Sequence, residues 1–431
     1  MADAGTRADV ADEASASPPR ARIPKLLRDL DFRRYWTAQS ISYLGDQVTI
    51  VALPLIAVVV LHASAFEVGA LSALGTLPNL LFALHTGAFT DRVRRRRRLM
   101  VTANLLSAAL LASIPLAYAL GTLSLPQLYV VAFGAGSLAM LFTVAASGLF
   151  ASLVPKEHYV QANTLIRGSY SFSWTAGPSL SGVLIQVISA PIVLLLDVAS
   201  FLGSGYLLGR IDAPDRREEN DVERGGVREG LRWVRRVPAL LAKFSADTAL
   251  NFSYSIYFAL VFLFAVRELH LAPGLIGLVL GAGAIGSLLG TAAAAGTIKR
   301  LGVGRAFFFG AFVYPAALLL APLAQGPHWL AASLLTLAEF LSGFGLMVCD
   351  ITGSSIQQSL TPDRYRARAQ GVYLVFNNGS RPLGALAGGL LGTWLGIRPT
   401  LVLAAVLGVV CVAALIPSPL WRMRALPEEA A

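Results

Sequence analysis

Five acidic residues lie inside long apolar stretches of this 431-residue chain, where a carboxyl group could take up and release protons. They are Asp46, Asp197, Asp247, Glu339 and Asp350. A charged group in the middle of a bilayer is unfavourable, so such residues are candidates for a proton or ion pathway. Asp46 and Glu339 lie near the middle of their stretches. We therefore predict that Asp46 is the proton-coupling residue, with Glu339 as the alternative.

The other acidic residues have simpler interpretations. Asp197 is expected to hydrogen-bond to a neighbouring helix, and Asp247 is a lesser candidate. Asp350 lies near the end of its stretch, where water reaches it. For Asp46 itself, a structural hydrogen bond to Gln47 or to the facing half of the molecule is the alternative to proton coupling.

No residue pattern indicates an enzyme, a cofactor or a metal site. The chain has no paired catalytic groups and no Gly-x-x-x-x-Gly-Lys-Ser/Thr loop for a nucleotide. Its histidines are scattered: His62, His85, His158, His270 and His328. We expect no catalytic residue, no cofactor and no bound metal. Without a nucleotide site, the expected energy source is an ion gradient.

The composition places these acidic residues in a membrane. The chain is 55% hydrophobic and 14% charged, whereas soluble domains carry about a quarter charged residues. A helix needs about 20 apolar residues to cross the hydrocarbon core. Twelve stretches have this character and predict an all-α integral membrane protein: 36–61, 67–88, 99–120, 125–153, 163–188, 191–210, 239–266, 272–296, 304–324, 328–351, 370–394 and 400–418.

Basic residues predict the orientation of these spans. We assign all but two of the 35 lysines and arginines to the tails, to alternate loops, to the central linker or to helix ends on the same side, the exceptions being Arg267 and Arg398. Because positive charge stays on the cytoplasmic side, both termini are expected to be cytoplasmic. No lysine or arginine is expected deep in a span. The heavy use of alanine, and of arginine over lysine, suggests a GC-rich bacterium, and the expected location is the bacterial plasma (inner) membrane.

Six arginines within seven positions, 92–98, follow the second span. The run lacks interleaved aromatic residues and a soluble domain, so no nucleic-acid partner is expected. Most of these arginines are expected to fix the orientation of the chain and to contact anionic membrane lipids.

The chain also repeats itself. The segment from Gly87 aligns with that from Gly296, and Gly177 and Gly182 align with Gly384 and Gly389. Duplicated halves predict a site between them. The expected organisation is a disordered cytoplasmic tail (1–34), a six-helix bundle (35–211), a charged cytoplasmic linker (212–238), a second six-helix bundle (239–420) and a cytoplasmic tail (421–431).

These features resemble the major facilitator superfamily over nearly the whole chain. "GAFTDRVRRRRR" resembles the signature that follows helix 2 of the family, and "GPSLSG" resembles the helix-5 signature of drug–proton antiporters, with Ser181 where a glycine is usual. "YLGDQVTIVALPLIA", "LLLDVASFL" and "QQSLTPDRYRARAQG" resemble the subgroup of macrolide and siderophore exporters. Many antiporters of the family use an arginine in helix 4. The stretch 125–153 has none, so coupling would be built differently.

The resemblance implies two bundles that alternate access to a cavity between them. In that fold Asp91 would face the start of the helix near Gly371, where the helix dipole favours a negative charge. Gly87, Asp91, Arg92 and Arg95 would then form an inner gate. Gly177, Pro178 and Gly182 would form the antiporter-like signature.

The resemblance also implies an activity. We expect a monomer that exports a lipophilic, neutral or cationic small molecule, such as a drug, antibiotic or secondary metabolite, in exchange for protons. An importer or a metabolite or siderophore transporter of the same fold is the alternative. Anionic substrates are disfavoured because no basic residue is expected deep in a span. Tyr254, Phe258 and Phe172 are candidates for lining the cavity, although aromatic residues in membrane helices also pack or face lipid.

Overall fold

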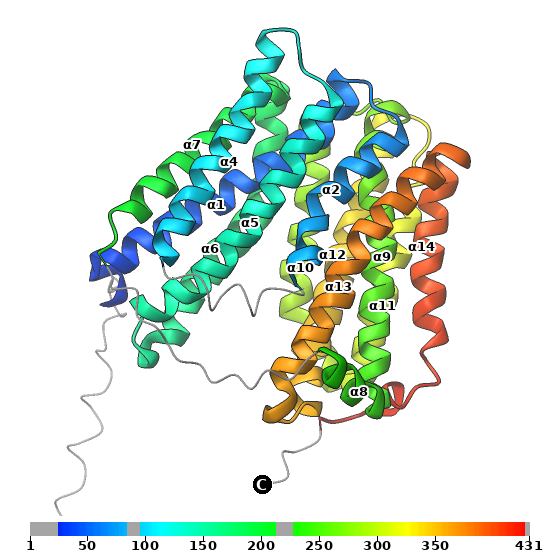
Figure 1. Ribbon diagram of the computed structural model, residues 1–431. Coiled ribbons are helices and arrows are strands. Elements are labelled where there is room, and N and C mark those ends of the chain that lie inside the picture. The colour runs from blue at the N-terminus through cyan, green and yellow to red at the C-terminus, as the bar shows by residue number, and fades with distance from the viewer. Residues whose placement is uncertain (1–24, 84–94, 213–226, 427–431) are drawn as a thin grey trace, which may run out of the picture.

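The computed structural model describes residues 25–83, 95–212 and 227–426, and the secondary structure in these ranges is helical (Figure 1). The first half contains α1 (Leu30–Leu55), α2 (Ala65–Ala83), α4 (Arg96–Ala119), α5 (Leu125–Leu153), α6 (Tyr159–Ile188) and α7 (Ala190–Gly209). The second half contains α8 (Val227–Arg236), α9 (Pro238–Arg267), α10 (Pro273–Leu301), α11 (Val303–Ala317), α12 (His328–Leu360), α13 (Asp363–Trp394) and α14 (Ile397–Ala414).

Ten of the described helices are long and apolar enough to cross a membrane. The expected all-α integral membrane fold is therefore confirmed. Helices α6 and α13, of 30 and 32 residues, have the necessary length but carry more polar residues. The exact number of twelve spans stays a prediction.

Several helices extend beyond the apolar stretches that predicted them. Helix α1 begins at Leu30, and the Asp29 carboxylate caps it by accepting hydrogen bonds from the backbone N–H groups of Asp31 and Phe32 at 2.8 and 3.0 Å. Helix α12 continues to Leu360. Hydropathy detects only the part of a helix that lies in hydrocarbon, whereas backbone hydrogen bonding continues into polar residues that face water.

Two matching turns preserve the internal repeat in three dimensions. His62 follows α1 and His270 follows α9, and both have a φ of 52°. The same hydrogen bonds close the two turns: Ala63 N–H donates to Ala57 O at 2.8 Å, and Leu271 N–H donates to Ala265 O at 2.9 Å. The repeat seen in the sequence is thus also a repeat of backbone geometry, including a left-handed residue that is uncommon outside glycine.

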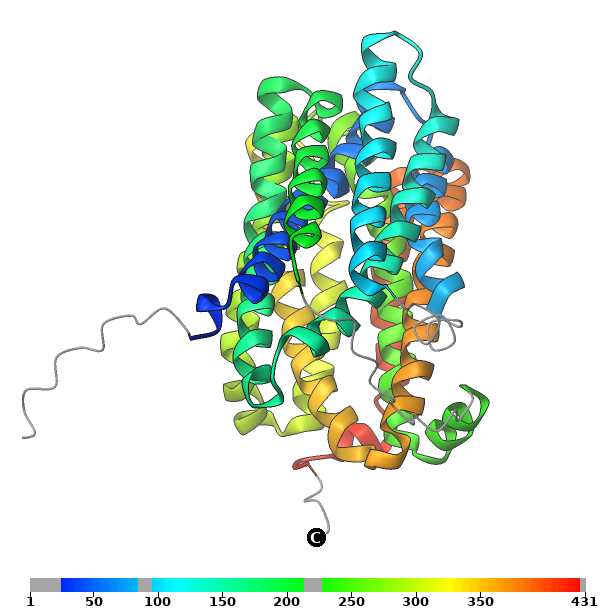
Figure 2. The ribbon, with the colours of Figure 1, turned by 60° about the vertical axis from the view of Figure 1, so that its left-hand side comes forward.

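The two halves meet through α6 and α10 and through α2 and α13. We call the end of the molecule with the His62 and His270 turns the closed end, and the end with α8 the linker end (Figures 1 and 2). At the closed end, a Cβ added to Gly182 would lie 2.5 Å from the Cα of Gly277, and one added to Gly69 would lie 2.6 Å from the Cα of Gly389. Both distances are too short for any side chain, so glycine is required where the backbones approach.

We expect Gly182→Ala to separate the halves at the closed end. The added methyl group would overlap the backbone of Gly277, and overpacking of this kind costs about 1–3 kcal/mol, enough for roughly a tenfold shift in conformational populations. Spin labels at Leu120 and Leu323, which are exposed on different halves, should report a longer mean distance.

Gly168→Ala on the same helix is the matched control, because its Cβ would meet no atom within 4 Å. An unchanged distance distribution for Gly182→Ala would contradict the assigned role of this contact.

Candidate functional site

Asp46 lies at the middle of α1 and is half-buried. It interacts electrostatically with Tyr43 on its own helix and with Tyr170 of α6. Its carboxylate has no hydrogen-bond or ion-pair partner among the described residues. The neighbouring Gln47 packs against Gly177 instead, where a Cβ would lie 2.4 Å from Gln47 Cγ. The alternative in which Gln47 holds Asp46 is therefore not observed.

Asp197 of α7 has a structural environment. It is fully buried, and it accepts hydrogen bonds from Thr49 Oγ1 of α1 and from Ser200 Oγ, the latter at 2.9 Å. Gly45 of α1 leaves room for this contact, because a Cβ there would lie 2.2 Å from Asp197 Oδ1. The expected hydrogen bond from Asp197 to a neighbouring helix is thus found, and it joins α1 to α7.

Glu339 is the buried carboxyl group of the second half. It lies on α12 with 6% of its surface exposed, and it accepts a hydrogen bond from Tyr257 Oη of α9 at 2.8 Å. Tyr254 and Phe258, two of the cavity candidates, flank Tyr257 on α9, and their ring centroids are 5.8 Å apart. The sequence did not indicate Tyr257 as the partner of Glu339, since the two residues are far apart in the chain.

The structure shows that the expectation of no deep basic residue was wrong. Arg381 is the nineteenth of the 32 residues of α13. Its side chain is exposed, and its Nε–H donates to Asn251 Oδ1 of α9 at 3.1 Å. It interacts electrostatically with Tyr254 in its own half and with Tyr170 of the first half. Of its five N–H donors, the other four have no partner in the part of the chain that the structure describes.

Arg381 is a basic residue deep in a span, so anionic substrates are no longer disfavoured. The signal for Arg381 was present in the sequence, since it lies eleven residues inside the predicted span 370–394. A span predicted from the mean hydropathy of a stretch can contain a single charged residue, because one charge changes the mean only slightly.

A buried ion pair accounts for Asp247. Lys243, on the first turns of α9, is 3% exposed and contacts the Asp247 carboxylate at 2.9 Å. Its Nζ also donates to Gln357 Oε1 of α12 at 2.8 Å. Asp350 is exposed, as expected from its position.

Phe172 lies apart from the other cavity candidates. With Trp36, Ser40 and Leu44 it lines a groove of about 360 Å³ between α1 and α6. Ser40 and Ser169 join the two helices there through a 2.8 Å hydrogen bond between their hydroxyl groups.

The helix-5 signature lies between α1 and α10. Gly177 contacts Gln47, and Gly182 contacts Gly277, whose Cβ would lie 2.7 Å from the carbonyl oxygen of Pro178. Ser181, where the signature usually has glycine, is 1% exposed, and its hydroxyl has no partner among the described residues.

Only part of the candidate inner gate can be described. Gly87, Asp91 and Arg92 lie outside the described residues, and Arg95 precedes α4. Two further arginines of the run contact protein backbone: Arg96 Nη1 donates to Gly148 O of α5 at 2.9 Å, and Arg97 donates to Ile211 O. These two side chains hold α4 to its neighbours, beyond any effect on orientation.

Arg267 and Arg398, the two exceptions in the predicted charge pattern, both make contacts at the closed end. Arg267 donates from Nη2 to Ala63 O at 2.8 Å and so links the second half to the first. Arg398 pairs with Glu268 and donates to the carbonyl oxygens of Pro322 and Ala324 at 3.1 Å.

Among the described residues, no three histidine, cysteine or acidic side chains are grouped as metal ligands would be.

Two helical halves that meet through small residues, with charged groups at mid-helix, define a membrane transporter of the major facilitator type. Residues 25–430 match the family described as transmembrane secretion effector, MFS_3, and the chain belongs to this family. It is a multi-pass membrane transporter and not an enzyme.

Two relatives are similar over most of their length. The uncharacterized MFS-type transporter YfiS of Bacillus subtilis (strain 168) is 24% identical, with 84% of this chain and 86% of the relative covered. The multidrug efflux pump Tap of Mycolicibacterium fortuitum is 26% identical, with 83% and 88% covered.

Solved structures share the fold at low sequence identity. A variant of the nucleoside transporter NupG superposes with a TM-score of 0.73 at 13% identity, covering 90% of this chain and 99% of that one. A bacterial homologue of the iron transporter ferroportin gives 0.70 in its inward-facing state, at 17% identity and with 90% and 99% covered. In its outward-facing state it gives 0.58, at 16% identity and with 90% and 98% covered.

We expect Thr49→Val to lower the stability of the protein and to leave its transport mechanism intact. The substitution keeps the shape of the side chain but removes a hydrogen bond to a buried carboxylate, a loss of about 1–3 kcal/mol. Thermal unfolding in detergent should show a lower midpoint. Thr102→Val, whose hydroxyl is exposed and bonds only within its own helix, should leave the midpoint unchanged. Equal midpoints for both variants would contradict a structural role for the bond between Thr49 and Asp197.

Proposed function

We propose that this protein exports a lipophilic small molecule, such as a drug, antibiotic or secondary metabolite, in exchange for protons. The two halves would expose the site alternately to the two sides of the membrane. The efflux pump Tap, a relative over most of the chain, supports export of this class of compound.

The observation that carries the proposal is the carboxylate of Asp46, which interacts electrostatically with the nearby Asp197 carboxylate but has no hydrogen-bond or ion-pair partner among the described residues. An acidic side chain at the centre of a spanning helix costs about 2.5–3.5 kcal/mol. Asp197, Asp247 and Glu339 are each stabilised by a hydrogen bond or an ion pair. Asp46 has no such partner among the described residues. Gain or loss of a proton therefore changes the free energy of its carboxyl group without breaking a hydrogen bond or an ion pair. Glu339 remains the substitute, because among the described residues its carboxylate is held by one hydrogen bond, from Tyr257.

The described conformation fits a state open to the cytoplasm. The glycine contacts between the halves are tightest at the closed end, and the ferroportin homologue superposes better in its inward-facing than in its outward-facing state. With both termini cytoplasmic in a bacterial inner membrane, as the charge pattern predicts, the linker end is the cytoplasmic end. A monomer would then receive substrate from the cytoplasm or from the inner leaflet.

Closure of the linker end would use the predicted inner gate. Gly87, Asp91, Arg92 and Arg95 would approach α13 near Gly371. The expectation that this helix starts near Gly371 was wrong, because α13 begins at Asp363 and Gly371 is its ninth residue. The helix dipole would therefore attract a carboxylate about two turns away, at Asp363, and not at Gly371 itself. A Cβ at Gly371 meets no atom within 4 Å, so this part of α13 has room for the approach. Gly177, Pro178 and Gly182 would hold the opposite end until the halves rock.

Arg381 adds a recognition element to the proposal. Its free N–H donors suit an anionic or strongly accepting group on the substrate. Aromatic rings at Tyr170, Trp174, Tyr254 and Phe258 surround this region in both halves, and they suit the apolar remainder. The proposed substrate class thus includes lipophilic acids as well as neutral and cationic compounds.

We expect Asp46→Asn to abolish uphill efflux and to spare downhill exchange. The amide mimics a permanently protonated carboxyl group, so binding and rocking continue but the proton cycle stops. Transport in proteoliposomes under an imposed pH gradient measures both activities. Asp46→Glu should retain part of the uphill rate, and Glu157→Gln, which removes an exposed acid, should behave as wild type.

If Asp46→Asn still concentrates substrate at the wild-type rate, Asp46 is not the coupling residue, and Glu339→Gln should be tested in the same way. Direction is tested with cells that express the protein. Loss of dye or antibiotic that stops on addition of a protonophore supports export, whereas protonophore-sensitive accumulation would support the alternative of an importer.

We expect Arg381→Gln to discriminate between acidic and neutral substrates. Removing a hydrogen bond to a charged group costs about 1.5–3 kcal/mol, so the apparent KM for a lipophilic acid should rise by roughly ten- to hundredfold. The KM for its methyl ester should change little, and Arg381→Lys should lie between. Equal effects on acid and ester would show that Arg381 does not recognise charge.

A further inference from the structure

Helix α8 has two faces of different character. It lies at the linker end against α9 and α13, outside the bundle of spanning helices (Figures 1 and 2). Residues three and four apart share a face of a helix. Trp233, Val234 and Gly230 therefore lie on one side, and Arg232, Arg235 and Arg236 lie on the other.

The first face is docked firmly on α13. Val234 is 1% exposed, and the ring of Trp233 stacks on that of Tyr365 with 5.2 Å between centroids. A Cβ at Gly230 would lie 2.6 Å from the carbonyl oxygen of Arg368, so the two backbones are in direct contact. Contacts of this kind fix the helix and therefore fix the direction of its opposite face.

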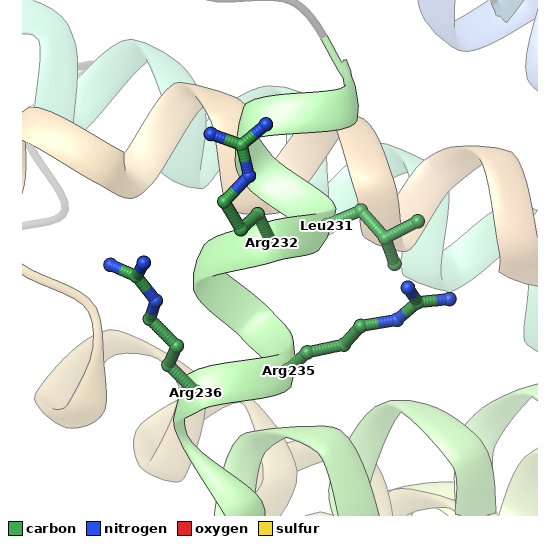
Figure 3. A pocket seen from close by; sticks show the side chains of 4 residues that line it. All are labelled: Leu231, Arg232, Arg235 and Arg236. Carbon is green, nitrogen blue, oxygen red and sulfur yellow. The ribbon is translucent and has the colours of Figure 1, made fainter.

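The second face presents three arginines. Arg232, Arg235 and Arg236 are exposed, and none has a hydrogen bond or ion pair to a described residue. With Leu231 they line a hollow of about 550 Å³. Figure 3 shows Arg235 extending beside Leu231, and Arg232 and Arg236 extending from successive turns. The acid on this helix, Glu229, is used elsewhere, in a 2.9 Å ion pair with Arg368.

The position of the arginine face, next to the start of a spanning helix, indicates the kind of ligand that it binds. Arg236 is followed, after one residue, by Pro238, the first residue of the spanning helix α9. The guanidinium groups therefore lie at the level where a spanning helix leaves the bilayer, and Leu231 offers an apolar contact beside them. Arginine clusters directly next to a spanning helix attract anionic headgroups, and their planar groups bind phosphate in two-point contacts.

We propose that Arg232, Arg235 and Arg236 of α8 form a binding site for the headgroup of an anionic phospholipid. The phosphate contacts the guanidinium groups, and the lipid chains lie along the adjoining end of α9. Because α8 is docked on α13, a bound lipid holds the linker end of the second half at the membrane surface. The site is separate from the proposed transport path and does not depend on the substrate or the coupling ion.

The test uses the purified full-length protein in detergent with tail-labelled phosphatidylglycerol and phosphatidylcholine as probes. Wild type should bind phosphatidylglycerol more tightly than phosphatidylcholine. Each arginine near a membrane surface contributes about fivefold, so R232Q/R235Q/R236Q should lose roughly a hundredfold in affinity for phosphatidylglycerol. R232K/R235K/R236K keeps the charge but loses the two-point contacts, so its affinity should lie between those of wild type and R232Q/R235Q/R236Q.

A second triple variant controls for net charge. K299Q/R300Q/R424Q removes three exposed positive charges from other parts of the described chain and should change the affinity by less than twofold. Similar losses in both glutamine variants would show a general charge effect and overturn the site. Full binding by R232Q/R235Q/R236Q would also overturn it. Displacement of the lipid by an equal concentration of inorganic phosphate would identify the ligand as a soluble anion instead.

Discussion

Charged groups inside an apolar helix bundle must find partners, and this constraint organises much of the structure. Asp197 uses the hydroxyl groups of Thr49 and Ser200, and Lys243 pairs with Asp247. The bond from Thr49 to Asp197 joins α1 to α7, and Lys243, which pairs with Asp247 on its own helix, also joins α9 to α12 through Gln357. A neutral residue at any of these positions would leave the opposite partner unsatisfied, which in a buried site costs more than the bond contributes.

Two charged groups, Asp46 and Arg381, are not fully paired among the described residues. Asp46 has no partner among the described residues, and Arg381 satisfies one N–H group through Asn251. They belong to different halves, and Tyr170 interacts electrostatically with both. A transporter needs charged groups whose partners change between states, and a group that is already fully paired serves this purpose poorly. In the proposed function, this incomplete pairing would leave both groups able to change partners between states.

The sequence was sufficient for the class of fold, because hydropathy, the repeat and the charge pattern each reflect one simple constraint of the bilayer. Individual contacts were harder. That Asp197 bonds to a neighbouring helix follows from the cost of burying a charge, but the choice of Thr49 as partner depends on helix rotation. The pairing of Tyr257 with Glu339 depends on how α9 and α12 cross, which the spacing of residues along the chain does not encode. Arg381 was missed for a different reason, since averaging over a span hides a single charge.

The glycine contacts at the closed end have a consequence for how the membrane itself acts on the protein. At Gly69 with Gly389, and at Gly182 with Gly277, backbone meets backbone without side chains between them. In lipid such contacts gain dispersion energy but little from the hydrophobic effect, because acyl chains solvate apolar surface as well as protein does. Lipid tails therefore compete for the same surface on nearly equal terms. With the alternating access proposed above, the balance between open and closed forms would respond to bilayer thickness and lateral pressure, and the physical state of the membrane would then regulate the transporter.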